Sequence, residues 1–192
     1  MKFLSESTIN KIIDAESDLR YKVIFLLLRD TGARANEILQ LKFDDIDIVD
    51  KNITITTLKR KDRQKRTVPI TNQTLTLLLS YLKNWNVYNT NSRKKYSSDK
   101  LFCVDYDTIL KRFKEICKSL NIDNVGLHIF RHSFASNFIK RVKKMKGRVD
   151  ESDLLILSRI LGHKRLETTT DIYIHISASQ IDETYRMLFE KT

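Results

Sequence analysis

The chain of 192 residues carries 35 Lys and Arg against 24 Asp and Glu, a formal net charge of +11. Its length fits one large domain or two small ones, and a hydrophobic content of 41% supplies a core and excludes a disordered chain. Because it has no run of about 18 apolar residues and no signal peptide, we expect no membrane partner. The charge excess favours a polyanionic partner instead.

The two cysteines, Cys103 and Cys117, have neither the spacing of metal ligands nor a disulfide framework around them. Reduced thiols are usual in the cytosol. We therefore expect both to be packed, reduced side chains in a cytoplasmic protein.

Three helices are predicted at the start of the chain. The first helix is predicted over residues 5–17, which carry an apolar stripe at helical spacing. Ser5 at its start is a residue type that caps helix N-termini. A second, mostly buried helix over 19–30 stops at Thr31-Gly32. A short third helix follows over 35–41. The apolar stripe of the first helix consists of Ile9, Ile12 and Ile13.

The spacing of apolar residues then changes from the helical pattern to alternation, which predicts a β-hairpin. Residues 52–57 alternate between apolar and polar, and 67–70 are their partner, where Pro69 favours an edge strand or a strand end. Six of the eight residues 59–66 between these strands are basic. A hairpin tip with that charge needs a counter-charge outside the domain. The residues expected to contact it are Lys59, Arg60, Arg63, Lys65 and Arg66.

The rest of the chain is predicted to be helical. A second basic run covers 140–148, a last helical segment contains Tyr173, and residues 179–189 form an amphipathic tail. The other expected elements are helices over 75–85, 108–120 and 128–145, a polar loop over 86–99, and a helix through Leu154, Leu157 and Leu161 that ends at Gly162.

One stretch combines two residues suited to phosphate chemistry. His128 and Arg131 are three apart near the start of a helix that opens after Gly126, so both project from one face. Arg binds two phosphate oxygens, and His donates to a third or moves a proton. Because His-x-x-Arg also occurs by chance on many helices, the pair alone does not establish a phosphate site.

Other candidate residues each have an ordinary explanation. Arg34 suits a helix surface, His163 suits a helix end where the dipole favours it, and a lone tyrosine such as Tyr173 is most often a core residue. Their order is more informative. It runs Thr31-Gly32-Ala33-Arg34-Ala35-Asn36-Glu37-Ile38, a basic hairpin, His128-x-x-Arg131, Leu161-Gly162-His163 and Thr168-Thr169-Thr170-Asp171-Ile172-Tyr173.

This succession resembles the catalytic domain of the tyrosine recombinase (phage integrase) family over about residues 3–176. The resemblance implies a mainly α fold with a small antiparallel β-sheet at one edge, an α+β arrangement. It also implies a site-specific recombinase that cleaves and rejoins double-stranded DNA through a 3′-phosphotyrosyl intermediate, without metal, ATP or another cofactor.

The resemblance also implies a role for each motif residue. Tyr173 is the nucleophile that attacks the scissile phosphate. Arg34 and Arg131 hold the non-bridging oxygens and stabilise the charge of the transition state. His128 assists proton transfer at the nucleophile, and His163 hydrogen-bonds the phosphate.

The family places its catalytic lysine at the end of the first hairpin strand, a fixed distance before the proline of the return strand. By this resemblance Lys61 is the general acid toward the leaving 5′-oxygen, with Lys59 as second choice. Glu37 matches an acidic position beside Arg34 that orients the site.

Two departures from the family pattern concern organisation. We expect residues 1–192 to be a single catalytic domain without the N-terminal core-binding domain of most relatives, either as an excised fragment or as a short member. The link at 142–150, between the helix with His-x-x-Arg and the helix that leads to Leu-Gly-His, is longer than is usual in the family. Its basic residues suggest an extra DNA contact or a solvated loop. The family implies a homo-oligomer, a tetramer, on synapsed sites and a monomer when free.

Three alternatives compete with this interpretation. A type IB topoisomerase uses much the same chemistry but religates the original strand. A DNA-binding module without enzymatic activity would explain the charge, but would leave the motif residues unexplained. A metal site at His128 and His132, four residues apart, lacks an acidic or Cys ligand at a telling spacing.

Overall fold

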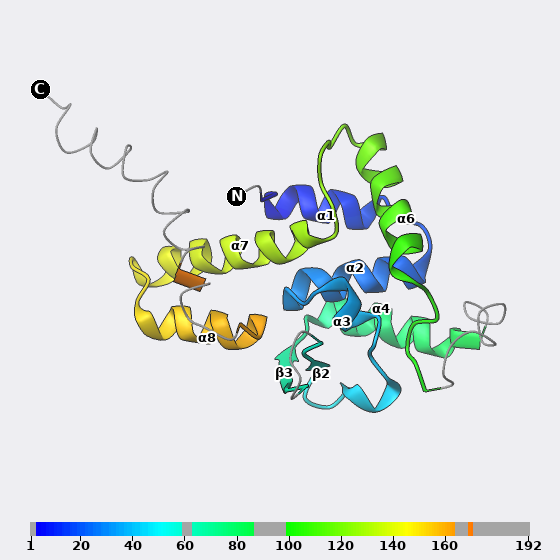
Figure 1. Cartoon of the computed structure of the whole chain (residues 1–192), viewed down its shortest axis with the longest axis horizontal. Coiled ribbons are helices and arrows are strands. Elements are labelled where there is room, and N and C mark those ends of the chain that lie inside the picture. Colours follow the sequence, from blue (N-terminus) through cyan, green and yellow to red (C-terminus); the bar gives the residue numbers. More distant parts are fainter. Residues whose placement is uncertain (1–2, 59–62, 87–98, 164–168, 171–192) are drawn as a thin grey trace, which may run out of the picture.

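The computed structural model describes residues 3–58, 63–86, 99–163 and 169–170 (Figure 1). Over these ranges the fold is mainly helical with one three-stranded antiparallel sheet, so the predicted fold class is confirmed. No helix within them is long and apolar enough to cross a membrane.

The first two helices are α1 (Glu6–Asp14) and α2 (Leu19–Thr31). The Ser5 hydroxyl caps α1 as predicted, accepting the Thr8 backbone N–H at 3.1 Å. Residues 23–28 of α2 are all completely buried, so the middle of this helix has no face in solvent. Because α1 and several later helices pack on α2, it is the central element of the domain.

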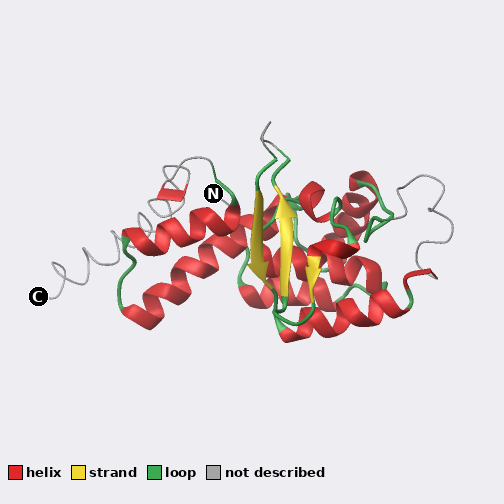
Figure 2. Cartoon of the chain, turned by 90° about the horizontal axis from the view of Figure 1, so that it is seen from below, coloured by secondary structure: helices red, strands yellow, loops and turns green. Residues whose placement is uncertain are grey.

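A short helix and the sheet follow α2. The helix α3 (Ala35–Ile38) leads through the 3-10 turn η1 (Phe43–Asp45) into β1 (Ile46–Asp47), β2 (Asn52–Thr56) and β3 (Lys65–Pro69). The strands are antiparallel in the order β1-β2-β3, and Figure 2 shows them lying on one side of the helices. β3 is an edge strand, which agrees with the position of Pro69. The two-residue β1 was not expected, because it is too short to show alternation.

The remaining described helices are α4 (Asn72–Lys83), α6 (Tyr106–Ser119), α7 (His128–Lys146) and α8 (Glu151–Leu161). α4 and α6 begin slightly earlier than predicted, because the side chains of Thr71 and Asp105 cap them. α7 continues through the first half of the expected basic link, and ends at Gly147 in the left-handed conformation.

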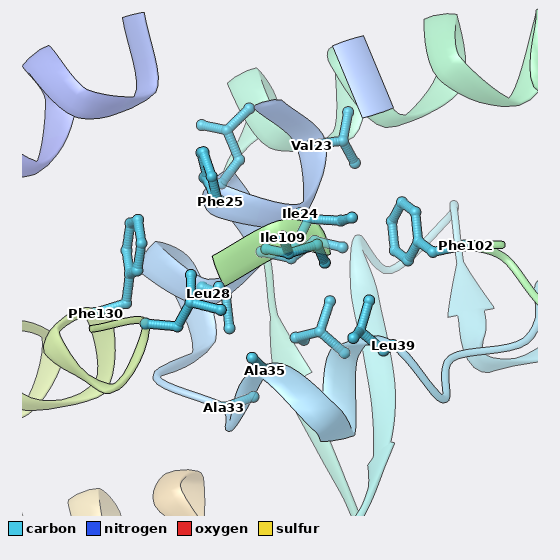
Figure 3. Packing of buried hydrophobic residues seen from close by; sticks show 14 of the residues in the cluster. Val23, Ile24, Phe25, Leu28, Ala33, Ala35, Leu39, Phe102, Ile109 and Phe130 are labelled. Carbon is cyan, nitrogen blue, oxygen red and sulfur yellow. The ribbon is translucent and has the colours of Figure 1, made fainter. Parts of the chain in front are cut away.

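The main core surrounds α2 (Figure 3). Phe25 of α2 stacks on Phe130 of α7 with ring centroids 5.6 Å apart, and meets the edge of Phe113 of α6 at 5.9 Å. Such aromatic pairs add about 0.5–1.5 kcal/mol to the area that they bury. The contact fixes the first turns of α7, which carry the His-x-x-Arg motif, against the centre of the domain.

A second, smaller core joins α7 to α8, which lie side by side at one end of the molecule (Figures 1 and 2). This cluster places the C-terminal end of α8, and therefore Gly162-His163, close to α7. Its buried members are Ala135, Ile139, Leu154, Leu157 and Leu161.

Both cysteines are buried and form no disulfide, as expected from the sequence. Burial raises the pKa of the Cys117 thiol to about 11. That thiol therefore stays protonated and unreactive at neutral pH.

The joint between α2 and α3 depends on Gly32, whose φ of 59° lies in the left-handed region. A Cβ at this position would lie 2.7 Å from Phe134 and 2.8 Å from Leu161, closer than real contacts allow. The glycine is therefore required both by the turn and by the approach of α7 and α8.

We predict that Gly32→Ala lowers the free energy of unfolding by about 2–3 kcal/mol, because it adds both backbone strain and a steric clash. The matched control is Gly126→Ala, since no atom lies within 4 Å of a Cβ built there and its φ is not positive. The control should change stability by less than about 0.5 kcal/mol. Urea denaturation measures both, and equal stability of the two variants would contradict the packing described.

Candidate active site

Arg131 lies in the second turn of α7 and is only 4% exposed. Its Nη1 donates to the Gly32 carbonyl and its Nη2 to the Leu161 carbonyl, both at 2.9 Å. These carbonyls end α2 and α8, where helices leave acceptors unsatisfied. One guanidinium therefore joins three helices. Burial is the main cause that lowers the pKa of Arg131 to about 9, with Arg34 second, so the side chain is still charged at neutral pH.

Arg34 is the N-cap residue of α3 and is held by Glu37, one turn later. Its backbone N–H donates to Glu37 Oε2 and its Nη1 to Oε1, each at 3.1 Å. Arg66 Nη2 also donates to Oε2, at 2.7 Å. Burial alone raises the pKa of Glu37, but the charges and hydrogen bonds of Arg66 and Arg34 together lower it below its usual value. Glu37 is therefore a buried carboxylate shared by two arginines, and its orienting role stays a prediction.

The structure places Arg66 differently from the other hairpin residues. Its side chain is 10% exposed and its guanidinium contacts protein groups, whereas Arg63 and Lys65 are exposed. In this structure the Arg66 guanidinium is therefore engaged with protein groups, and its contact with DNA stays a prediction. Lys59, Arg60 and Lys61 lie outside the described residues.

His163 directly follows Gly162, which ends α8 with a φ of 67°. Its Nδ1 lies 2.8 Å from the Thr169 hydroxyl, so the ring is held on one side. Burial first, and then the positive charges of Arg131 and Arg34, lower the pKa of His163 to about 4. Arg66 and His128 act in the same direction. The ring is therefore neutral at pH 7.

His128 is the first residue of α7 and lines a cleft of about 290 Å³ with Arg34. Its ring meets that of His132 edge to face, with centroids 4.9 Å apart. Burial, followed by the charge of Arg131, lowers the pKa of His132. Among the described residues, no group of three or more His, Cys, Asp or Glu gathers in a way that would hold a metal ion.

The cleft also contains two residues that sequence reasoning missed, Asn36 and Tyr106. Asn36 lies inside the sequence motif around Arg34, so its position in that motif could have indicated that it belongs to the site. Tyr106 gave none, because it opens α6 far from any motif.

Four of the six predicted catalytic residues thus come together. Arg34, His128, Arg131 and His163 approach from the N-terminus of α3, from α7 and from the end of α8. The other two, Lys61 and Tyr173, lie outside the described residues. The arrangement offers two charged guanidinium groups beside the neutral imidazole of His163 in a partly buried place, which suits a phosphodiester.

Comparison with known proteins agrees with this geometry. The phage integrase family profile matches residues 2–180. The chain belongs to the phage integrase family. Among its relatives, tyrosine recombinase XerA of Saccharolobus solfataricus is 34% identical over 185 residues, which are 96% of this chain and 56% of that protein.

Two solved structures of this family share the fold. The XerH site-specific recombinase, bound to its difH substrate, matches with a TM-score of 0.72 at 23% identity, over 95% of this chain and 52% of that one. The catalytic domain of bacteriophage HP1 integrase matches with a TM-score of 0.64 at 25% identity, over 98% of this chain and 95% of that domain. The chain thus spans about half the length of the XerA and XerH proteins.

The low pKa of His163 predicts a pH dependence of stability. As pH falls from 6.5 toward 4, the unfolded chain binds a proton at this histidine and the folded chain does not, so stability falls. Between pH 7 and pH 5 the wild type should lose about 1–2 kcal/mol more than His163→Gln. Urea denaturation at the two pH values tests this, because the other histidines are common to both proteins. Equal losses would show that the folded-state pKa of His163 is near its ordinary value.

Proposed function

We propose that this integrase-family chain is the catalytic part of a tyrosine site-specific recombinase, which cleaves and rejoins double-stranded DNA through a 3′-phosphotyrosyl intermediate. The observation that carries the proposal is the convergence of Arg34, Arg131 and His163 on one partly buried place, where the charges of the two arginines act on each other and on the neutral His163 ring. A binding module would need neither a neutral histidine nor a buried arginine at that place.

The two arginines are suited to the transition state of phosphoryl transfer. Each Nη of Arg131 uses one proton on a carbonyl, which leaves further donors of its fork for phosphate oxygens. Arg34 is held by Glu37 through one nitrogen and is 23% exposed, so it faces the cleft while anchored. Donors fixed before the substrate arrives stabilise developing charge with little reorganisation.

The histidines complete the phosphate site. In the tautomer in which Nδ1 accepts from the Thr169 hydroxyl, the neutral His163 ring carries its proton on Nε2, and we assign that N–H as the donor to a non-bridging oxygen. His128 shares the cleft with Arg34 and accepts the proton of the attacking hydroxyl.

The bond changes follow from the roles that the family motifs assign. The Tyr173 hydroxyl oxygen forms a bond to phosphorus, and the bond from phosphorus to the 5′-oxygen breaks. Lys61 gives a proton to that oxygen, so a 5′-hydroxyl leaves. Rejoining reverses these steps with a 5′-hydroxyl of another strand as the attacking group.

The proposed DNA partner is supported by charge. Exposed Arg63 and Lys65 at the turn end of the hairpin add to a net charge of +11, and XerH, which has the same fold, is bound to its difH substrate. We further propose that the chain acts in the cytoplasm on chromosomal DNA, as a tetramer on paired sites.

The first activity prediction concerns the nucleophile. Tyr173→Phe should abolish the covalent adduct on a nicked DNA site and leave noncovalent binding nearly unchanged, because only one hydroxyl is lost. Tyr185→Phe is the matched control and should form the adduct at the wild-type rate. Denaturing electrophoresis and peptide mapping measure the adduct, and an adduct on Tyr185 would overturn the assignment.

The second activity prediction concerns the general acid of the proposed reaction. Lys61→Ala should cleave ordinary DNA about 10²–10⁴-fold more slowly. A substrate with sulfur at the bridging 5′ position should restore much of the rate, because a thiolate leaves without a proton. Arg34→Ala should gain nothing from sulfur, since its defect is in charge stabilisation. If sulfur rescues Lys59→Ala and not Lys61→Ala, Lys59 is the acid.

A further inference from the structure

Arg66 makes more interactions than a DNA-contacting surface residue would. Its three nitrogens donate to three different segments: Nη2 to Glu37 at 2.7 Å, Nη1 to the Thr57 hydroxyl at 3.0 Å, and Nε to the Ile160 carbonyl at 2.7 Å. These partners lie on α3, just after β2, and in the last turn of α8. One side chain of β3 therefore connects the hairpin to both segments that present the arginine and histidine of the site.

The contact of Arg66 with α8 lies next to a similar contact made by Arg131. Arg66 binds the carbonyl of Ile160 and Arg131 that of Leu161, so two arginines hold consecutive acceptors at the end of this helix. The next residues are Gly162 and His163. A Cβ on Gly162 would lie 3.0 Å from Arg66 Nη1, so the guanidinium lies directly against this turn. The position of His163 thus depends on both arginines.

The contact with α3 controls Arg34. Glu37 is almost completely buried, and its two oxygens are divided between Arg34 and Arg66. A buried carboxylate that loses one of two cationic partners binds the remaining one more tightly. Without Arg66, the Arg34 guanidinium would be drawn toward Glu37 and away from the cleft.

We propose that Arg66 is a positioning residue for the recombination reaction: it holds Arg34 and the His163 turn in place before DNA arrives. The inference rests on the proposed function, and goes beyond it in assigning a role outside the set of residues that touch the phosphate. Lysine cannot replace it fully, because a single ammonium cannot donate to three groups in a fixed plane.

The first test is the titration of His163 by NMR, which does not require activity. The charged and titratable groups that act on this ring are Arg131 and His128 of α7, Arg34 at α3 and Arg66 of β3. Because Arg66→Gln removes one positive charge, it should raise the pKa of His163 by about 0.5–1 unit. Arg66→Lys keeps the charge and should raise it less.

The matched control is Arg112→Gln. Arg112 also forms a two-pronged ion pair with a fully buried carboxylate, that of Glu16, at 2.9 and 3.0 Å. This pair is formed between α6 and the turn after α1, and is not part of the site. The control should lower the melting temperature as Arg66→Gln does, yet leave the His163 titration unchanged.

The second test is the single-turnover rate of adduct formation at saturating DNA. Arg66→Gln should cleave about 10²-fold more slowly while its Kd for DNA changes only a few-fold, because the defect is misplacement of catalytic groups. Arg66→Lys should be intermediate, and Arg112→Gln should cleave at the wild-type rate. The double variant Glu37→Gln/Arg66→Gln should be no slower than the slower single variant, since both residues act through one network.

Two results would overturn the positioning role of Arg66. An unchanged His163 pKa together with a wild-type rate in Arg66→Gln would overturn the proposal. So would a raised Kd with a normal rate at saturation, which would make Arg66 a DNA contact. If Arg66→Gln does not fold, Arg66→Lys provides the same two measurements. If the wild type forms no adduct, the proposed function fails, while the titration still decides whether Arg66 positions His163.

Discussion

The structure depends on one buried cation placed between helix ends. Arg131 satisfies carbonyls at the ends of α2 and α8, and no apolar side chain could do so. A charge buried this deeply is costly unless it is hydrogen-bonded, and the two carbonyls provide those bonds. The same burial keeps the guanidinium poorly hydrated, which would strengthen its hydrogen bonds to a phosphate in the proposed reaction. Under that proposal, stability and phosphate recognition use different protons of one side chain.

The sequence predicted most of the fold, because its helices have clear caps and stops. Ser5 caps the start of α1 and Gly162 caps the end of α8, as expected, and the apolar run of α2 marked the centre of the core. Motif order also identified four site residues that the structure brings together. Their contacts were not predictable, because the carbonyl partners of Arg131 lie 99 and 30 residues away along the chain.

Arg66 shows why the hairpin was harder to interpret. A run rich in basic residues looks uniform, and we expected the return strand to begin only at Thr67. In the structure β3 begins at Lys65, so Arg66 shares the inward face with Val68, while Lys65 and Thr67 face solvent. Alternation was therefore a usable signal, and the shorter predicted strand concealed it.

The separation of the core into two clusters has a thermodynamic consequence. The smaller cluster that joins α7 to α8 has only a few buried residues, whereas the middle of α2 is completely buried in the main core. Local opening should therefore detach α8 at a lower free energy than global unfolding, and expose its amides to hydrogen exchange first. Because Arg131 and Arg66 both hold the end of α8, such opening would release the histidine turn and dismantle the site. Mild denaturant would then inactivate molecules whose central helix is still intact.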